Sequence, residues 1–246
     1  MSKTPQTLSS MALHLLRERI ISGELRPGAK LSDLVLSREI GISRTPLREA
    51  IRQLAADGLV DVVPHQGATV RAPSGDELDE LYEIRGLLEG HAAARAATRR
   101  TPEQAAELLA ICGAMDAIPA PALAPAKAAT LDAAGTKQQR DLDLGFHRRV
   151  LALSGLTRLQ RLVEDAGIIA RPFETMDDLL TGEQLRSAQR HHRAIAQAIA
   201  DGDAERARQA MTAHIEEGRS GIHERHAAWH DSSTATVPAA LRRFVR

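Results

Sequence analysis

The chain has 246 residues, enough for one or two domains with a buried core. Hydrophobic residues make up 43% and charged residues 26%, as in soluble globular proteins, and no apolar run approaches the roughly 20 residues that span a bilayer. The formal net charge is +0 and Cys112 is the single cysteine, which excludes a strongly basic protein and an internal disulfide framework. The first ten residues lack the apolar stretch of a signal peptide, so we expect a cytoplasmic protein with no membrane partner.

The first 72 residues are predicted to form three helices followed by a hairpin. Apolar residues at helical spacing predict a helix over residues 8–22, and Ser32 can cap a second helix that ends before Gly41. A third helix is expected over residues 44–57, and strands over 59–63 and 68–71. Two short helices joined by a glycine turn are the helix-turn-helix pattern, and the hairpin would add the wing of a winged helix over residues 1–72.

The third predicted helix carries an apolar stripe beside a basic one. The apolar stripe has the spacing i, i+3, i+4 and i+7 and consists of Leu47, Ala50, Ile51 and Leu54. The basic stripe consists of Arg44, Arg48 and Arg52. Arginine can bind guanine through two hydrogen bonds or hold a phosphate, so this helix suits the major groove of double-stranded DNA. The alternative is an ordinary amphipathic helix with a solvated basic face.

This part of the chain resembles the GntR family of bacterial regulators. The resemblance is carried by residues 23–28 (GELRPG), 41–50 (GISRTPLREA), 54–59 and 64–67 (PHQG). It implies DNA contacts from the helix and the wing, at Ser43, Arg44, Thr45, Arg48, His65 and Gly67. One departure concerns the second helix, where the family often has an arginine and this chain has Leu34.

The rest of the chain is predicted to be helical. After a joint at Ala72-Pro73, helices are expected from Ser74 to about residue 98, from Thr101, and over 137–154, 157–170, 183–200 and 203–220. The segment 114–136 contains three prolines and is expected to be a mobile loop. A sensor domain over 76–222 would then be followed by a C-terminal tail, 223–246, which we expect to be weakly ordered beyond His230.

Three histidines and one aspartate fall on the inward faces of these helices. Asp143 and His147 share one face at i and i+4, and His192 and His214 lie on the apolar arcs of two later helices. Buried imidazoles need partners, and a divalent cation would satisfy all four groups at once. Three nitrogens and one oxygen suit zinc, nickel, iron or manganese. The alternatives are hydrogen bonds among these side chains or to an anionic ligand.

This region resembles the FCD domain of FadR-like GntR regulators, an antiparallel bundle of six or seven helices. The matching segments are 82–89 (YEIRGLLE), 143–147 (DLGFH), 192–195 (HRAI) and 202–214. The resemblance implies a metal bound by Asp143, His147, His192 and His214, and a small organic acid as effector. Arg85 could pair with the effector's carboxylate through two charge-assisted bonds, or could instead form an ion pair with Glu89 at i+4.

The sequence thus predicts a mainly α protein, a winged helix followed by an FCD-like bundle, acting as a homodimeric transcriptional regulator. Two winged helices would read a two-fold operator, and the effector would change its affinity. One alternative is a metal-responsive regulator in which the metal is the signal. Another is a metalloenzyme, which is disfavoured because no separate acid or base accompanies the ligands. We therefore expect that the protein is not an enzyme.

Overall fold

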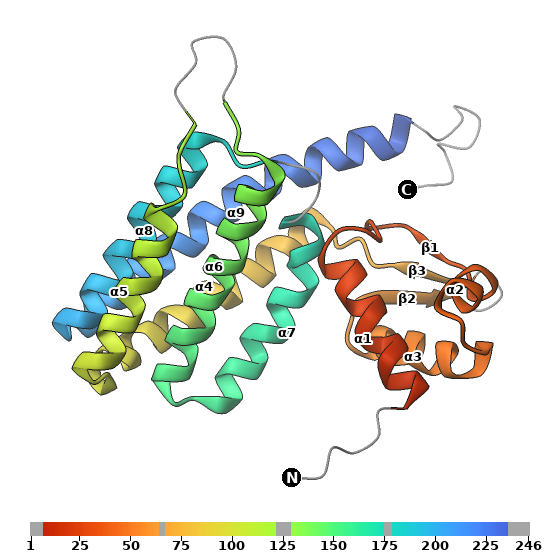
Figure 1. The fold of residues 1–246 in the computed structure, drawn as a ribbon, viewed down its shortest axis with the longest axis horizontal. Helices are drawn as coiled ribbons and strands as arrows, with labels where there is room; N and C mark the ends of the chain where they lie inside the picture. The colour runs from red at the N-terminus through yellow and green to blue at the C-terminus, as the bar shows by residue number, and fades with distance from the viewer. Residues whose placement is uncertain (1–6, 64–66, 122–128, 175–178, 236–246) are drawn as a thin grey trace. The chain divides into compact units, whose positions relative to one another are not determined.

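The computed structural model describes residues 7–63, 67–121, 129–174 and 179–235 (Figure 1). The chain divides into two compact units. The first comprises the described parts of Met1–Leu78, Gly167–Asp177 and Ile222–Arg246, and the second those of Asp79–Ala166 and Asp178–Gly221. In the described part of the chain, no helix is both long and apolar enough to cross a membrane. The domain limits expected above, 1–72, 76–222 and 223–246, stay predictions.

The first unit contains the predicted winged helix. Its elements are α1 (Leu8–Ile21), β1 (Lys30–Leu31), α2 (Asp33–Ile40), α3 (Arg44–Ala56), β2 (Val60–Val63) and β3 (Gly67–Val70). The strands form an antiparallel sheet in the order β1-β3-β2, with Val62 opposite Ala68 and Leu31 opposite the same residue on the other side. We did not predict β1, because a strand of two residues is too short to show an alternating pattern.

A single apolar core holds these elements together. It contains Leu16 and Ile20 from α1, Leu47 and Leu54 from α3, and Val70 from β3, and each of these side chains is at most 2% exposed. The four-residue apolar stripe predicted for α3 is buried, which confirms the helical period. Because this stripe faces the core, the basic stripe beside it must face outward.

The turn between α2 and α3 forms as the sequence predicts. The hydroxyl oxygen of Ser32 accepts a hydrogen bond from the backbone N–H of Val35 and caps α2. Gly41 ends α2 with a φ of 76°, a left-handed conformation that glycine adopts without steric cost. These two signals fix both ends of α2, and therefore the point at which the chain turns toward α3.

In the described residues, every element after β3 is a helix. These helices are α4 (Gly75–Arg99), α5 (Pro102–Asp116), α6 (Ala133–Ser154), α7 (Thr157–Glu174), α8 (Gly182–Asp201) and α9 (Ala204–Ala235). The second unit is a helical bundle built from their parts within Asp79–Ala166 and Asp178–Gly221. Connections of two residues after α4, α6 and α8 turn the chain back, so the members of each pair run antiparallel. Thr101 and Thr181 each begin a helix with a capping box, as partners of Gln104 and Gln184. The predicted fold class is confirmed.

Three predicted boundaries are wrong. The segment between α5 and α6 is 117–132 rather than 114–136, since α5 continues to Asp116 and Asp132 caps α6. Its end is ordered, because Thr130 and Thr181 form an antiparallel bridge; residues 122–128 lie outside the described residues. α7 runs to Glu174, past Pro172, and α9 runs to Ala235 rather than to about 220. Gly218 and Gly221 of α9 each cost only about 1 kcal/mol relative to alanine, which is too little to end the helix.

Cys112 on α5 is expected to be chemically inert in the folded protein. Its side chain is buried, and burial raises the pKa of the thiol to about 11, so very little reactive thiolate exists at pH 8. We expect iodoacetamide to label the native chain at least about 100-fold more slowly than the chain unfolded in guanidinium chloride. Mass spectrometry of timed samples measures both rates. Rapid labelling of the native protein would show that α5 opens frequently.

Candidate DNA-binding surface and metal centre

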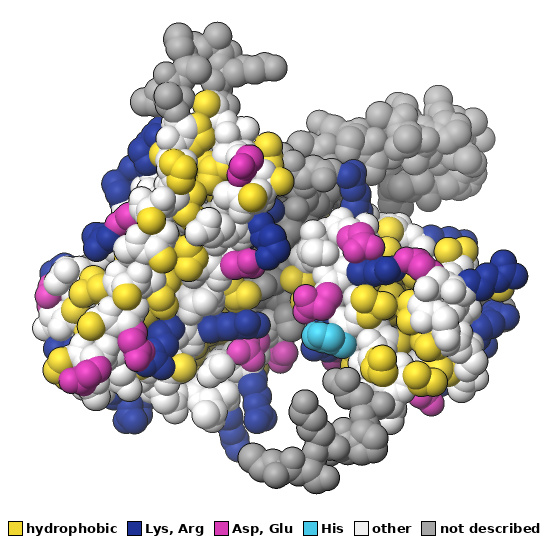
Figure 2. All heavy atoms as spheres, in the orientation of Figure 1, with side chains coloured by type: hydrophobic (Ala, Val, Ile, Leu, Met, Phe, Trp, Pro, Cys, Tyr) yellow, Lys and Arg dark blue, Asp and Glu magenta, His cyan; other side chains and the backbone are white. Residues whose placement is uncertain are grey.

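α3 presents the side chains that we predicted to contact DNA. The exposed residues at its start and along its basic stripe are Ser43, Arg44, Thr45, Arg48 and Arg52. Ser43 is the N-cap of α3, but its side chain makes no capping hydrogen bond. The first N–H groups of the helix therefore remain available to an anion such as a phosphate. Figure 2 shows Lys and Arg side chains gathered at the edge of the winged helix near α2.

Asp33, the first residue of α2, forms ion pairs with two of these arginines. Its Oδ2 accepts a hydrogen bond from Nε of Arg48 at 2.6 Å and lies 3.8 Å from a terminal nitrogen of Arg44. Sequence reasoning missed this contact, which joins residues 15 positions apart on two helices. The pairing engages Nε of Arg48 and so orients its guanidinium group, which is exposed by about half.

The structure describes all of α2 but only part of the wing. Gly67 begins β3 with a φ of 96°, which favours glycine at this position. His65, the other predicted wing contact, lies outside the described residues. On α2, Leu34 is 49% exposed and Val35 is 60% exposed. An exposed leucine therefore stands where the family resemblance led us to expect an arginine.

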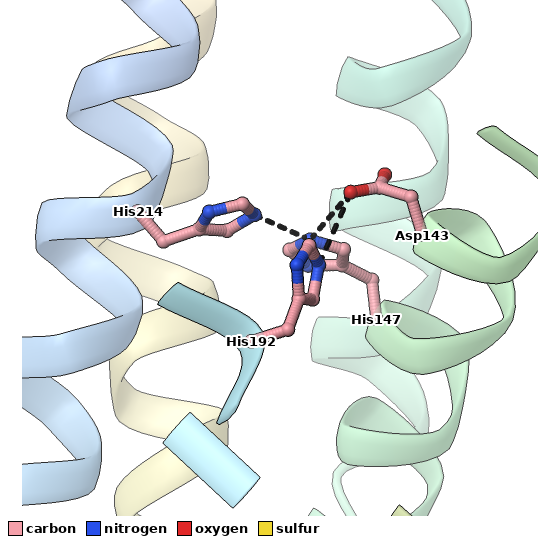
Figure 3. A group of neighbouring side chains, drawn as sticks. All are labelled: Asp143, His147, His192 and His214. Atoms are coloured by element: carbon pink, nitrogen blue, oxygen red, sulfur yellow. Dashed lines mark hydrogen bonds and ion pairs between the residues drawn. The ribbon is translucent and has the colours of Figure 1, made fainter. Parts of the chain in front are cut away.

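The second unit brings the four predicted metal ligands together (Figure 3). Asp143 and His147 project from α6, His192 from α8 and His214 from α9. Their nearest ligand atoms all lie within 4.8 Å of one another. Side chains from three helices therefore converge on one small volume, as the inward faces predicted.

The spacing of the ligand atoms fits a metal ion. Nε2 of His147 lies 3.1 Å from Nε2 of His214 and 4.0 Å from Oδ1 of Asp143. Nε2 of His192 lies 3.1 Å from the same Oδ1. With bonds of about 2.1 Å to a central metal, ligand atoms at right angles are about 3.0 Å apart and opposite ones about 4.2 Å. The three distances given above are close to these values.

The histidine tautomers also favour a cation. Nδ1 of His192 lies 2.7 Å from the carbonyl oxygen of Ala188, which can only accept, so Nδ1 carries a hydrogen. In the neutral ring, Nε2 then bears a lone pair directed toward the Asp143 carboxylate, and this buried atom has no hydrogen-bond partner among the described residues. Two facing acceptors need a proton or a metal ion between them, and a ligating imidazole has this arrangement.

Burial and the neighbouring rings act in opposite directions on the carboxylate. Burial alone would raise the pKa of Asp143, but the imidazoles of His192, His147 and His214 lower it well below its usual range. Burial, reinforced by the neighbouring His192 and His147, lowers the pKa of His214 well below its usual value. At neutral pH the site therefore contains an ionised carboxylate and a neutral His214, the forms in which these groups bind metals.

A second carboxylate, Glu89 of α4, lies behind His147. Its side chain is 1% exposed, and Oε2 lies 2.5 Å from Nδ1 of His147. Its other oxygen accepts a hydrogen bond from Nε of Arg85 at 2.9 Å, so Arg85 forms the ion pair that the sequence left as one of two alternatives. Burial would raise the pKa of Glu89, but His147 and Arg85 lower it to about 2. Burial by itself would lower the pKa of His147. The neighbouring Glu89 carboxylate has the larger effect, so the pKa of His147 is raised above its usual value.

Sequence reasoning missed a further polar side chain of α6. Gln139 lies one helical turn before Asp143 and is 2% exposed, and neither amide atom has a hydrogen-bond partner among the described residues. The i, i+4 spacing to Asp143 was the available signal. His191, next to a ligand in sequence, is not one of the four clustered residues: its Nε2 lies 3.0 Å from Glu217, and its ring centre is 5.8 Å from that of His214.

Comparisons with known proteins cover both units. Residues 8–70 match the family described as bacterial regulatory proteins, gntR family, and residues 80–217 match the FCD domain. A probable D-xylose utilization operon transcriptional repressor from Paenarthrobacter nicotinovorans is 31% identical over 86% of this chain and 87% of its own length. A helix-turn-helix transcriptional regulator from Agrobacterium vitis is 38% identical over 39% of this chain, and the match spans 56% of that protein.

A solved structure shows the same fold. Escherichia coli McbR/YncC has a TM-score of 0.72 and 22% sequence identity, covering 90% of this chain and all of that one. The family matches occur in the same order as the two folded parts, a winged helix and then a helical bundle. The families and relatives are regulators and not enzymes, which agrees with our prediction. This chain belongs to the GntR family of bacterial transcriptional regulators, with a DNA-binding winged helix followed by an FCD domain.

Proposed function

We propose that operator binding by residues 1–72 is controlled by a small organic acid bound at a divalent metal in residues 76–222. The observation that carries the proposal is the convergence of three imidazole nitrogens and one carboxylate oxygen within 4.8 Å. Four protein ligands leave coordination positions open for the effector's carboxylate on a metal that prefers six. The ligand set suits zinc, nickel, iron or manganese.

Arg85 is the proposed second contact of the effector. It already pairs with Glu89 through Nε, so a bidentate contact that used Nε would require this pair to open. The guanidinium carbon also lies 5.1 Å from the ring centre of Tyr82, which positions it over an aromatic face. An effector that drew Arg85 away would therefore change contacts on α4 as well as at the metal.

On the DNA side, we propose that Ser43, Arg44, Thr45, Arg48, Arg52, His65 and Gly67 contact the operator. The exposure of the described members of this set supports the proposal. We also propose that the protein acts as a homodimer, because the single winged helix of each chain presents one recognition helix. Two such helices related by a two-fold axis would read the two half-sites of a symmetric operator.

The experiment compares protein purified without chelator with protein stripped of metal. We expect about one divalent metal per chain in the former, measured by elemental analysis. DNA affinity is then measured by fluorescence anisotropy on a duplex selected from a random pool by the wild-type protein. Acetate, glycolate and malate are added with and without zinc, nickel or manganese, and the affinity is expected to change only when metal and acid are both present.

Two other results would contradict parts of the proposal. A change in DNA affinity on adding metal alone would favour the alternative in which the metal itself is the signal. Failure to bind metal even after supplementation would contradict the proposed ligand set, and would leave the histidines as a pocket for a ligand that needs no metal.

A further inference from the structure

The carboxylate of Glu89 is buried between a cation and a proposed metal ligand. Oε1 accepts from Arg85, while Oε2 faces Nδ1 of His147 at 2.5 Å. Both partners lie in the second unit, on α4 and α6. We propose that Glu89 is a positioning residue that fixes the tautomer and orientation of His147 so that its Nε2 faces the metal. The inference rests on the proposed metal site.

The partners of the two ring nitrogens of His147 determine which nitrogen carries the hydrogen. An ionised carboxylate can only accept hydrogen bonds, so Nδ1 of His147 must carry the hydrogen that it donates to Glu89. In the neutral ring Nε2 is then unprotonated, and it is the nitrogen that lies 3.1 Å from Nε2 of His214. A carboxylate behind a ligating imidazole also makes that imidazole a stronger donor to the metal.

His147 and His192 are held in different ways. Nδ1 of His192 donates to the carbonyl oxygen of Ala188, one turn earlier in its own helix. Both partners of this contact lie on α8, so it does not depend on the packing of another helix. In contrast, His147 depends on a side chain 58 residues away on another helix, so its orientation depends on how α4 and α6 pack.

The contact therefore ties α4 to the metal centre. The same carboxylate binds Arg85, the residue that we propose as an effector contact. Two direct contacts, Arg85 with Glu89 and Glu89 with His147, therefore connect Arg85 to a proposed metal ligand. The simpler alternative is that Glu89 serves only to neutralise Arg85 inside the bundle. In that case its loss would affect folding but would leave metal affinity of the folded protein unchanged.

The test uses the full chain with Glu89→Gln and Glu89→Leu. Glutamine keeps an oxygen that can accept from Nδ1 but removes the charge, whereas leucine removes the acceptor. Zinc affinity is measured by competition with a chromophoric chelator, after circular dichroism has shown that each variant is folded. We expect about tenfold weaker zinc binding for glutamine and about 100-fold weaker binding for leucine, the range found when a residue behind a metal ligand is lost.

Glu217→Gln is the matched control. Glu217 also lies beside a histidine, with 3.0 Å between its Oε2 and Nε2 of His191, but His191 is not among the four ligands. This variant is expected to bind zinc as the wild type does. It separates the loss of a carboxylate near a histidine from the loss of the one behind His147.

A second readout follows the ring directly. Two-dimensional nitrogen–proton NMR of the zinc-free protein distinguishes the two imidazole tautomers. His147 is expected to carry its hydrogen on Nδ1 in the wild type and in Glu89→Gln, and to populate both tautomers in Glu89→Leu. Because glutamine is close in shape to glutamate, it keeps the affinity test valid if the leucine variant does not fold.

The outcomes are distinguishable. Wild-type zinc affinity in both folded Glu89 variants, with an unchanged His147 tautomer, would overturn the positioning role and leave the metal site intact. A wild-type protein that binds no zinc, nickel, iron or manganese would overturn the proposed metal site and this inference with it.

Discussion

Arg48→Ala is expected to weaken binding to a selected operator by about 1–3 kcal/mol, or roughly 5- to 150-fold, if Arg48 contacts a base. Arg48 is exposed on the outward stripe of α3, and Asp33 engages its Nε at 2.6 Å. Such a contact leaves the guanidinium group oriented before DNA arrives, which reduces the entropy lost on binding. The substitution also leaves the Asp33 carboxylate with one fewer cation on a surface that is to approach phosphates.

The measurement is fluorescence anisotropy against the selected duplex and against a scrambled duplex, at several salt concentrations. Loss of a base contact reduces binding to the selected duplex more than to the scrambled one. Loss of a phosphate contact weakens both about equally and lowers the salt slope by about one. Arg206→Ala is the control, because Arg206 is an exposed arginine of α9 outside the winged helix and its loss changes the net charge equally. Unchanged affinity of Arg48→Ala would remove Arg48 from the interface.

Helix α3 could be predicted because its signals are local. The apolar spacing of Leu47, Ala50, Ile51 and Leu54 fixes which side is buried, and Gly41 fixes where the preceding helix ends. The contact between Asp33 and Arg48 could not be predicted in the same way. It depends on the crossing of α2 over α3, which no single helical period encodes.

The same distinction applies to the proposed metal centre. His192 could be placed inward because it lies at the centre of an apolar arc on its own helix, and it is fully buried. The family resemblance then joined it to Asp143, His147 and His214. Glu89 appeared in the sequence only as an i+4 partner of Arg85, because its contact with His147 arises when α4 packs beside α6. The ends of α7 and α9 were predicted too early: α7 continues past Pro172 to Glu174, and α9 continues to Ala235.

His192→Ala is expected to weaken metal binding by at least about 100-fold. Losing a residue behind a ligand weakens metal binding by about 10–100-fold. Losing a direct ligand should weaken it by at least the upper value of that range. Nε2 of His192 is buried beside Oδ1 of Asp143 and has no hydrogen-bond partner among the residues that the structure describes. The ring packs edge-on against Phe146 at 4.8 Å between centres. Alanine therefore leaves a cavity as well as an open coordination position, and the metal-free variant should also be less stable.

His191→Ala is the control that separates the loss of a metal ligand from the loss of a histidine side chain on α8. It removes the adjacent imidazole, which pairs with Glu217 and is not one of the four ligands, and it should bind metal as the wild type does. Metal at 100 times its dissociation constant stabilises a folded protein by about 2.7 kcal/mol, so wild type and His191→Ala should both gain thermal stability on adding metal. His192→Ala should show no such gain at the same metal concentration. A full thermal shift in His192→Ala would mean that the metal binds through a different set of side chains, since a cation held by three remaining ligands cannot keep the affinity that four provide.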